Sequence, residues 1–346
     1  MKNGLLGFLI SRPKDIPSAD YCGHWVVDKK HCHDAWLHWN ATNRCNFNCL
    51  YCFSHDDPQK KSGELPKINI PELIRSLDEA NKVFKIRFTG GGEPFLVPNI
   101  VEACLEITKK HYVGFNTNLI CDNVKDFAEK IDPERVANIN ASLHIKELEK
   151  YNLVERFVSN YLLCERKGIN IVASSVAYPP LADEAEKYRI FFKEKGIPVN
   201  FSFFQGSFNG KEYPRSYTEK EIEQFGLSRL WLKKNYEYQG ICNAGFNAGI
   251  VDPDGSIHPC FSMTKETLGN IYDKIEFKKH LVICPVKRCS CQLKNIDPYI
   301  FKKALEENLT LPGKIMPFAA YFSRRIRNQL FKLRIFCRKL NFFKPK

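Results

Sequence analysis

Three cysteines in the first part of the chain have a spacing that suits a metal cofactor. Cys45, Cys49 and Cys52 stand at C-x3-C-x2-C within NATNRCNFNCLYCFSHDDP. Cysteine thiolates hold iron–sulfur clusters, and three of them leave one iron of a [4Fe–4S] cluster open to a further ligand. The alternative is a zinc site, which needs a fourth ligand such as His55. Disulfides are disfavoured, because bridges between cysteines this close would be strained.

A glycine-rich stretch, RFTGGGEPFL, lies about forty residues further on. In it, Gly91, Gly92 and Glu93 come directly after a predicted strand. Glycine lets the backbone approach a ligand closely, and the Glu93 carboxylate can accept a hydrogen bond from an ammonium group. Taken alone, the stretch is equally typical of an ordinary turn between a strand and a helix.

Together the two motifs resemble those of the radical S-adenosylmethionine (SAM) superfamily. Tyr51 occupies the aromatic position of C-x3-C-x-aromatic-C, and GGEP from Gly91 to Pro94 is similar to the family's Gly-Gly-Glu motif. The resemblance implies a [4Fe–4S] cluster on the three cysteines, with SAM bound to the fourth iron through its amino and carboxylate groups. It also implies reductive cleavage of SAM to a 5′-deoxyadenosyl radical that abstracts hydrogen from a substrate C–H bond.

Later strand ends carry polar residues where relatives contact the methionine carboxylate and the ribose. Each of them could instead be a simple polar cap on its strand. With the two motifs, the resemblance implies these cofactor-binding residues: Tyr51, Gly91, Gly92, Glu93, Asn118, Ser142 and His144.

A second group of cysteines follows between residues 236 and 295. CNAGFNAGIVDPDGSIHPC runs from Cys242 to Cys260, and its DPDGS predicts a tight turn between two short strands. CPVKRCSC then supplies more cysteines. The region resembles the auxiliary-cluster domains called SPASM and twitch, which implies one further [4Fe–4S] cluster; a zinc ribbon is the alternative. The expected ligands are Cys242, Cys260, Cys289 and Cys291, with Cys284 able to replace one of them.

The elements that must position these residues alternate between strand and helix patterns. Such alternation predicts a parallel sheet built from βαβ units, and right-handed crossovers would curl it into a barrel or most of one. The resemblance to the radical SAM superfamily implies that this is a partial (β/α)6 barrel. The cysteines and the glycine-rich turn would then share the face at the carboxyl ends of the strands. The expected strands are 35–43, 85–90, 112–118, 136–144, 169–178 and 198–206; the expected helices are 71–84, 99–111, 123–131, 146–168 and 182–196.

Length and composition give the wider organisation. The 346 residues suffice for a barrel at 36–215 and a cysteine-rich domain at 236–295, preceded by an extension at 1–35 and followed by a tail at 300–346. The net charge of +13 gathers in the tail, where residues 309–346 hold ten Lys and Arg and no Asp or Glu. The tail also carries an apolar helical stripe: Ile326, Leu330, Leu333, Cys337 and Leu340.

A basic amphipathic tail suits three kinds of partner. An anionic membrane surface is favoured over protein packing, and RNA comes third. The amino-terminal apolar run is interrupted by Arg12-Pro13, so no signal peptide is expected. We therefore expect a cytoplasmic protein, which a lipid-binding tail would place at the inner face of the membrane.

The resemblance leaves the substrate open. If the tail binds lipid, a carbohydrate or lipid-linked envelope intermediate is the favoured substrate, and a net oxidation the favoured reaction. A peptide or protein substrate is the alternative, followed by RNA, and then by a non-catalytic iron–sulfur or zinc scaffold. The expected electron donor is a flavodoxin or ferredoxin.

Overall fold

The computed structural model describes residues 33–63, 65–229 and 241–285, together with residues 300, 303, 304 and 307. The chain divides into two units, residues 1–301 and 302–346. Nearly all of the predicted extension and tail lies outside the described residues, as do Cys289 and Cys291. No helix within the described ranges has the length and apolar character needed to cross a membrane.

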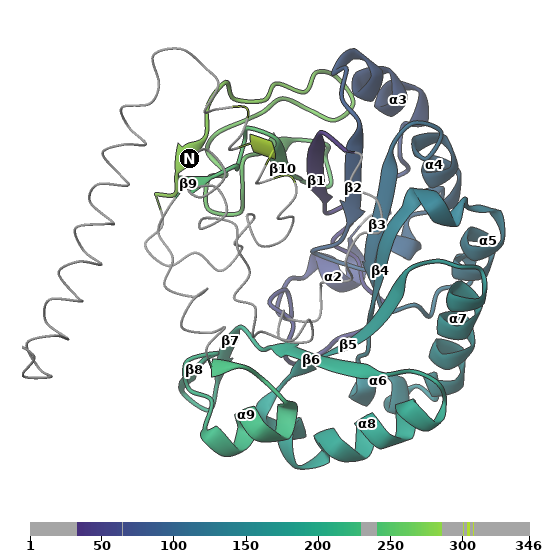
Figure 1. Ribbon diagram of the computed structural model, residues 1–346, viewed down its shortest axis with the longest axis vertical. Coiled ribbons are helices and arrows are strands. Elements are labelled where there is room, and N and C mark those ends of the chain that lie inside the picture. Colours follow the sequence, from purple (N-terminus) through teal and green to yellow (C-terminus); the bar gives the residue numbers. More distant parts are fainter. Residues whose placement is uncertain are drawn as a thin grey trace, which may run out of the picture. The chain divides into compact units, whose positions relative to one another are not determined.

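Six parallel strands form the centre of the first unit, in the same order in the sheet as in the chain. Helices follow the strands and cover the outer side of the curved sheet (Figure 1). The predicted partial (β/α)6 barrel is thereby confirmed. The strands are β1 (Ala35–Trp39), β2 (Phe84–Phe88), β3 (Tyr112–Thr117), β4 (Val136–Ser142), β5 (Ile171–Ala177) and β6 (Val199–Phe203). The covering helices are α3 (Ile70–Glu79), α4 (Ile100–Ile107), α5 (Asn123–Lys130), α7 (Val154–Arg166) and α8 (Ala185–Glu194).

The outer face of the sheet is aromatic. Phe115 of β3 stacks on Phe88 of β2 at 5.2 Å and on Phe95 at 4.7 Å, and it meets Phe127 of α5 edge-on. All four rings are buried. Such ring pairs add to the free energy of burial, so this layer fixes β2 and β3 against their helices.

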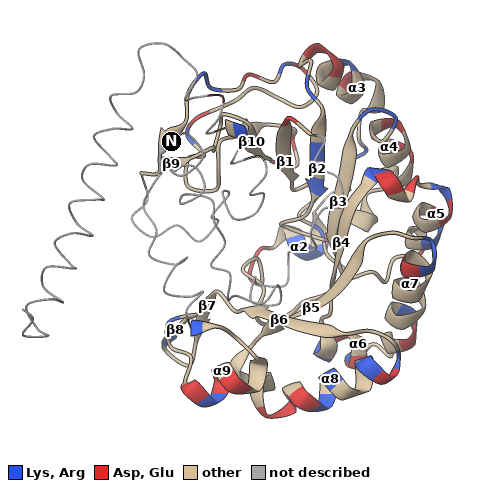
Figure 2. Ribbon diagram, in the orientation of Figure 1, with Lys and Arg blue, Asp and Glu red and all other residues tan. Residues whose placement is uncertain are grey.

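The inner face of the same strands is polar, because successive side chains of a strand alternate between its two faces. Arg87 of β2 donates to Asn116 of β3 at 3.0 Å and also to Asn138 of β4. Further along, Ser174 of β5 donates to Asn140 at 2.7 Å. Of the six barrel strands, β2 is the one that carries basic residues, Lys85 and Arg87 (Figure 2). The barrel lumen is therefore lined by amides, hydroxyls and cationic groups.

The helix predicted over 146–168 is instead two helices, α6 (Ile145–Lys150) and α7. Asn152 between them adopts φ +56°, a left-handed conformation that asparagine tolerates better than most residues. The backbone N–H of Leu153 then donates to the Leu148 carbonyl at 2.8 Å, which closes the first helix. Sequence periodicity did not reveal this break, because the apolar spacing continues through it.

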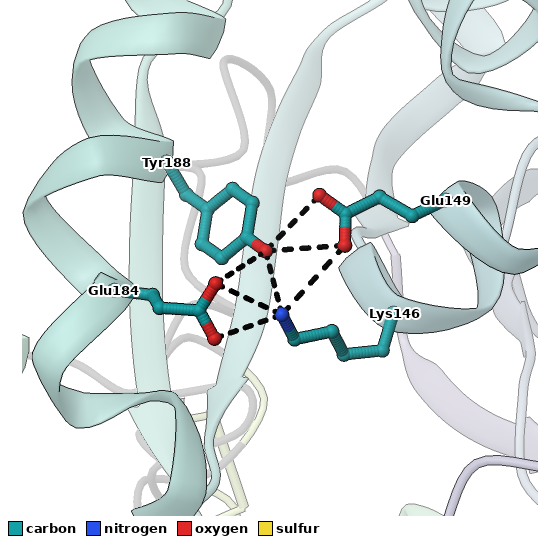
Figure 3. Close-up of polar contacts among 4 residues, drawn as sticks. All are labelled: Lys146, Glu149, Glu184 and Tyr188. Carbon is teal, nitrogen blue, oxygen red and sulfur yellow. Dashed lines mark hydrogen bonds and ion pairs between the residues drawn. The ribbon is translucent and has the colours of Figure 1, made fainter.

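A polar network joins α6 to the segment before α8 (Figure 3). Lys146 contacts Glu184 at 2.8 Å, the Tyr188 hydroxyl at 2.8 Å and Glu149 at 3.7 Å. Tyr188 is buried, whereas the three charged side chains are partly exposed. The short helix η4 (Pro179–Glu184) supplies Glu184, so the network fixes the spacing between neighbouring βα units.

The segment after β6, where a domain boundary is predicted, packs onto the barrel. It forms a hairpin, β7 (Gly206–Phe208) with β8 (Lys211–Tyr213), and then α9 (Glu219–Phe225). The buried Tyr217 hydroxyl donates to the Ala177 carbonyl at the end of β5 and accepts from the Phe204 N–H at 2.9 Å. Residues 206–225 therefore continue the barrel.

The cysteine-rich region also extends the barrel sheet. Strand β10 (Ala248–Val251) pairs in parallel with β1, and β11 (Ile257–His258) pairs antiparallel with β10. The tight turn predicted between these two strands is confirmed, and Gly255 in it has φ +86°. A smaller pair, β9 (Ile241–Cys242) with β12 (Val282–Ile283), lies outside this sheet. Strands β10 and β11 of the cysteine-rich region thus share a sheet with the barrel.

A buried histidine makes the fold sensitive to acid. The His111 side chain is 4% exposed, and its Nδ1 accepts from the Phe84 N–H at 3.2 Å. Burial lowers its pKa to about 4. Between pH 6.5 and 4 the unfolded chain takes up a proton that the folded chain does not, so stability falls as the pH falls.

We expect His111→Asn, which keeps an acceptor but cannot titrate there, to reduce this loss of stability by about 1–3 kcal/mol. Urea unfolding at pH 7 and pH 4.5 measures the effect. His280→Asn, at an exposed position, is the control. An unchanged pH dependence in His111→Asn would refute the prediction.

Candidate functional site

The cysteine loop begins directly after β1 and ends before the short helix α2 (Gln59–Ser62). The Cys45 N–H donates to the Lys60 carbonyl at 2.9 Å and so holds the start of the loop against α2. The Cys52 N–H donates to the Cys49 carbonyl at 3.1 Å, which closes a turn. Cys49 is buried, and Cys45 and Cys52 are partly buried. The loop therefore presents three thiols at the carboxyl end of the barrel.

Burial raises the pKa of Cys45 to about 11 and that of Cys49 to about 12, and nearby carboxylates and thiols act in the same direction. Thiolates at these positions would form together with a cation that offsets their charge. Three thiols on one loop are the donor set that iron–sulfur clusters use, so the chemistry of the loop fits a cluster.

The zinc alternative finds less support. The ring of His55 lies against the backbone, with Nδ1 3.1 Å from the Cys49 carbonyl oxygen. A structural zinc site requires four ligands around one ion.

The glycine-rich turn packs directly against the cysteine loop. The Gly92 N–H donates to the Thr42 carbonyl at 2.8 Å, and the Glu93 N–H donates to the Arg44 carbonyl at 2.9 Å. A Cβ on Gly92 would lie 1.9 Å from the Arg44 oxygen, and one on Gly91 would lie 2.4 Å from Asn40 Oδ1. These glycines thus allow the turn to pack closely against the segment that follows β1, and their predicted approach to SAM stays a prediction.

Glu93 is a buried bridge between the turn and β3. One carboxylate oxygen accepts from the Phe95 N–H at 3.1 Å and the Thr117 hydroxyl at 2.7 Å, and the other accepts from the Asn118 N–H at 2.7 Å. Burial raises its pKa to about 7, and the three donors oppose that shift. With three protein donors on its oxygens, Glu93 acts in this structure as a structural tie within the site. Its contact with the SAM ammonium stays a prediction.

Asn118 reaches the cysteine loop through Asn46. Its Nδ2 donates to Asn46 Oδ1 at 2.6 Å, and Asn46 Nδ2 lies 3.6 Å from the Cys121 sulfur. Cys121 lies in the loop after β3, beside a surface pocket of about 470 Å³. Asn46 therefore joins the cysteine loop to the end of β3.

Tyr51 of the cysteine loop meets His144, which follows β4. The Tyr51 hydroxyl lies 2.9 Å from His144 Nδ1, and the two rings stack at 5.8 Å. Burial lowers the pKa of His144 to about 4, which favours its neutral form. Ser142 ends β4 two residues earlier and is partly buried. The structure thus brings the predicted residues from the ends of β1, β2, β3 and β4 to one end of the barrel.

The second cysteine group is described in part. Cys242 lies on β9 opposite Val282 of β12, and Cys284 follows that pair directly. Cys260 is buried in a small apolar cluster with Trp36, against which Cys242 packs. The other two expected ligands, Cys289 and Cys291, lie outside the described residues.

Sequence reasoning missed several residues of the site. Asn46, Thr117 and Lys60 contact or surround the cysteine loop, but none belongs to a recognisable motif. Thr117 precedes a predicted strand-end residue, a position that could have indicated it. The sequence offered no sign that Lys60 is buried, because it stands in the polar run PQKKSGE.

Comparisons with known proteins agree with this geometry. The profile of the Radical SAM superfamily matches residues 39–146, from the end of β1 to the start of α6. An uncharacterized protein of Methanocaldococcus jannaschii, MJ0907, is 27% identical over 76% of this chain and 96% of its own length. The GTP 3',8-cyclase of Aliarcobacter butzleri is 25% identical over 54% of this chain, which spans 61% of that enzyme.

Among solved structures, native anSMEcpe with bound AdoMet superposes with a TM-score of 0.51 at 22% identity, over 69% of this chain and 78% of that one. This likeness shows the fold. Residues 39–146 therefore form a radical SAM domain. Enzymes of this superfamily use a [4Fe–4S] cluster and cleave SAM reductively.

Proposed function

We propose that this enzyme abstracts hydrogen from a C–H bond of a polar, hydroxyl-rich small molecule bound in the barrel lumen. Sugars and their lipid-linked derivatives are the favoured class, with oxidation as the net reaction. The proposal also assigns the cluster to Cys45, Cys49 and Cys52, and an auxiliary cluster to the second cysteine group. When bound, the first cluster supplies the electron that cleaves SAM, which a flavodoxin or ferredoxin would deliver.

The observation that supports a polar substrate is the amide of Asn138. This side chain is 1% exposed, and its Nδ2 has no hydrogen-bond partner among the residues that the structure describes. Its Oδ1 accepts from Arg87, and a Cβ on Gly114 would lie 3.7 Å from both side chains, so all three share the lumen face. A buried donor without an acceptor is costly, and a hydroxyl or carbonyl oxygen of a substrate would satisfy it.

The chain's own residues would orient this substrate. Strands β3 to β5 present Asn116, Asn138 and Ser174 toward one space. Such groups would form hydrogen bonds with substrate hydroxyls and so fix the orientation of the substrate. The aromatic outer face keeps the sheet rigid. The packed barrel also excludes water from a reactive radical.

A nucleotide is the second candidate substrate, since a relative is named GTP 3',8-cyclase and the lumen holds arginine. A peptide is the third, and RNA the fourth. A tail that binds membrane would favour a lipid-linked sugar. Anaerobic turnover with UDP-glucose, GTP and a peptide pool distinguishes these classes, because only a true substrate is consumed in step with 5′-deoxyadenosine.

Asn138→Leu tests the lumen directly. We expect it to lower substrate-coupled turnover about ten- to hundredfold, as the loss of a buried hydrogen bond of roughly 1–3 kcal/mol implies. Uncoupled cleavage of SAM should persist. Ser175→Ala is the control, because Ser175 is buried on β5 directly beside Ser174 but on the opposite face. Equal coupled turnover in Asn138→Leu and the wild type would exclude the lumen as the substrate site.

A further inference from the structure

Trp36 of β1 carries a buried polar group without a partner. Its side chain is 1% exposed, and its indole Nε1 forms no hydrogen bond with any residue that the structure describes. Tryptophan N–H groups usually find an acceptor when they are buried, because an unpaired donor costs free energy. The indole lies in the small apolar cluster that contains Cys260, apart from the main hydrophobic core. The missing acceptor would therefore lie beside the second cysteine group.

The register of the sheet places Trp36 and Cys260 on the same face. Trp36 pairs with Ala248 of β10, and His258 of β11 lies opposite Ile250 of β10. Cys260 follows His258 by two residues, and Ala248 precedes Ile250 by two, so the antiparallel register directs Cys260 toward Ala248. Paired residues of neighbouring strands point to the same face of a sheet. Because Ala248 carries only a methyl group, the indole and Cys260 join one cluster across it.

Cys242 reaches the same cluster from another strand. It lies on β9, and Ala244, two residues later, forms a parallel bridge with Ala248. The Cys242 side chain packs against the cluster that holds Trp36 and Cys260. Two of the expected auxiliary ligands therefore lie around one indole, and neither thiol accepts its N–H in this structure.

Trp39, three residues further along β1, provides an instructive contrast. It is equally buried, and its Nε1 also lacks a partner among the described residues. Its ring lies in the main core, where it stacks on Phe88 at 5.2 Å and meets Tyr272 edge-on at 6.1 Å. An unpartnered indole therefore does not by itself indicate a ligand. Trp36 differs in that two expected cluster ligands share its apolar cluster.

We propose that the Trp36 indole donates a hydrogen bond to a sulfide of the auxiliary iron–sulfur cluster and so raises the reduction potential of that cluster. Hydrogen bonds to cluster sulfurs are among the features that set this potential, and they favour the reduced, more negative state. A raised potential suits an electron acceptor, a role that the proposed net oxidation requires. Trp36 is thus a positioning and tuning residue. This inference rests on the auxiliary cluster assigned under the proposed function and is independent of the substrate class.

The test is the midpoint potential of the auxiliary cluster, measured without turnover. The full-length Cys45→Ala variant, in which the second cysteine group is intact, is reconstituted anaerobically and titrated while EPR follows the reduced cluster. In this parent, Trp36→Phe keeps an aromatic ring but removes the N–H. We expect it to lower the ratio of reduced to oxidised cluster about tenfold at a fixed potential, as the loss of one hydrogen bond implies, which corresponds to about 59 mV for one electron. Trp39→Phe, the matched control, should leave the potential unchanged.

A second measurement detects the contact itself. With ¹⁵N-labelled tryptophan, pulsed EPR of the reduced cluster should show a coupling to an indole nitrogen that Trp36→Phe removes and Trp39→Phe retains. Loss of that coupling in neither variant, or equal potentials in Trp36→Phe and the parent, would overturn the inference and leave the cluster assignment intact. A parent that binds no iron would instead refute the auxiliary cluster, and the inference would fall with it.

Discussion

Cys45→Ala is expected to abolish the formation of 5′-deoxyadenosine and to remove about four irons per chain, because one cluster of this type holds four. The loop offers three thiols, and Cys45 is the one whose backbone N–H fastens the loop to α2. Removing its thiol leaves two ligands, which hold a cluster poorly. Anaerobic reconstitution followed by iron and sulfide analysis, with a dithionite-driven assay for 5′-deoxyadenosine, measures both quantities.

Cys164→Ala provides the matched control for this experiment. Cys164 is also a free thiol, but it is buried on α7 in the aromatic and aliphatic core. Its removal should leave the iron content and the cleavage of SAM unchanged. Cys289→Ala should lower the iron content by the same amount as Cys45→Ala if the second group holds a cluster. Persistent 5′-deoxyadenosine in Cys45→Ala would show that the thiol trio is not the site of SAM cleavage.

Gly92→Ala is expected to have the second largest effect, with cleavage of SAM reduced at least about a hundredfold. The new Cβ would lie 1.9 Å from the Arg44 carbonyl oxygen, a distance that forces the glycine-rich turn and the cysteine loop apart. Two hydrogen bonds, to Thr42 and Arg44, would then be lost at the base of the loop. Misplacing reacting groups by about 1 Å can cost on the order of a hundredfold in rate.

The control for Gly92→Ala is Gly168→Ala. Gly168 has φ +78°, but no atom lies within 4 Å of the position its Cβ would take. This change should cost about 1 kcal/mol of stability through backbone strain and leave activity intact. Gly92 does not have a positive φ, so the effect of Gly92→Ala on activity would arise from the steric contact of the new Cβ alone. Similar activities of the two variants would mean that the turn does not position the loop.

Much of the barrel could be predicted, because the signals that specify it are local. Six strands and their helices follow from hydrophobic periodicity and from turn residues such as those before Asn123. The two motifs identified the strand ends that carry the site. The break at Asn152 was missed, because a single residue in the left-handed region leaves the apolar pattern undisturbed.

The interior of the site could not be predicted, because it depends on contacts between distant residues. Glu93 meets Thr117, and Asn46 meets both Asn118 and Cys121, across 24 to 75 positions of sequence. Periodicity carries no information about such pairs. The burial of Lys60 belongs to the same class, since Lys60 and Lys61 look alike in the sequence and differ only in the packed structure.

The pairing of β10 with β1 has a consequence for biosynthesis. The two strands lie side by side, with Trp36 opposite Ala248, yet β10 leaves the ribosome some two hundred residues after β1. Until then one edge of β1 has unpaired backbone groups, which are a template for aggregation. The Asn40 N–H, at the entrance to the cysteine loop, also waits for the Val251 carbonyl, its partner at 2.8 Å. A nascent chain that has completed its sixth strand would therefore still lack part of the frame that supports its first cysteines, so the frame of the iron site is completed only once β10 has been synthesised.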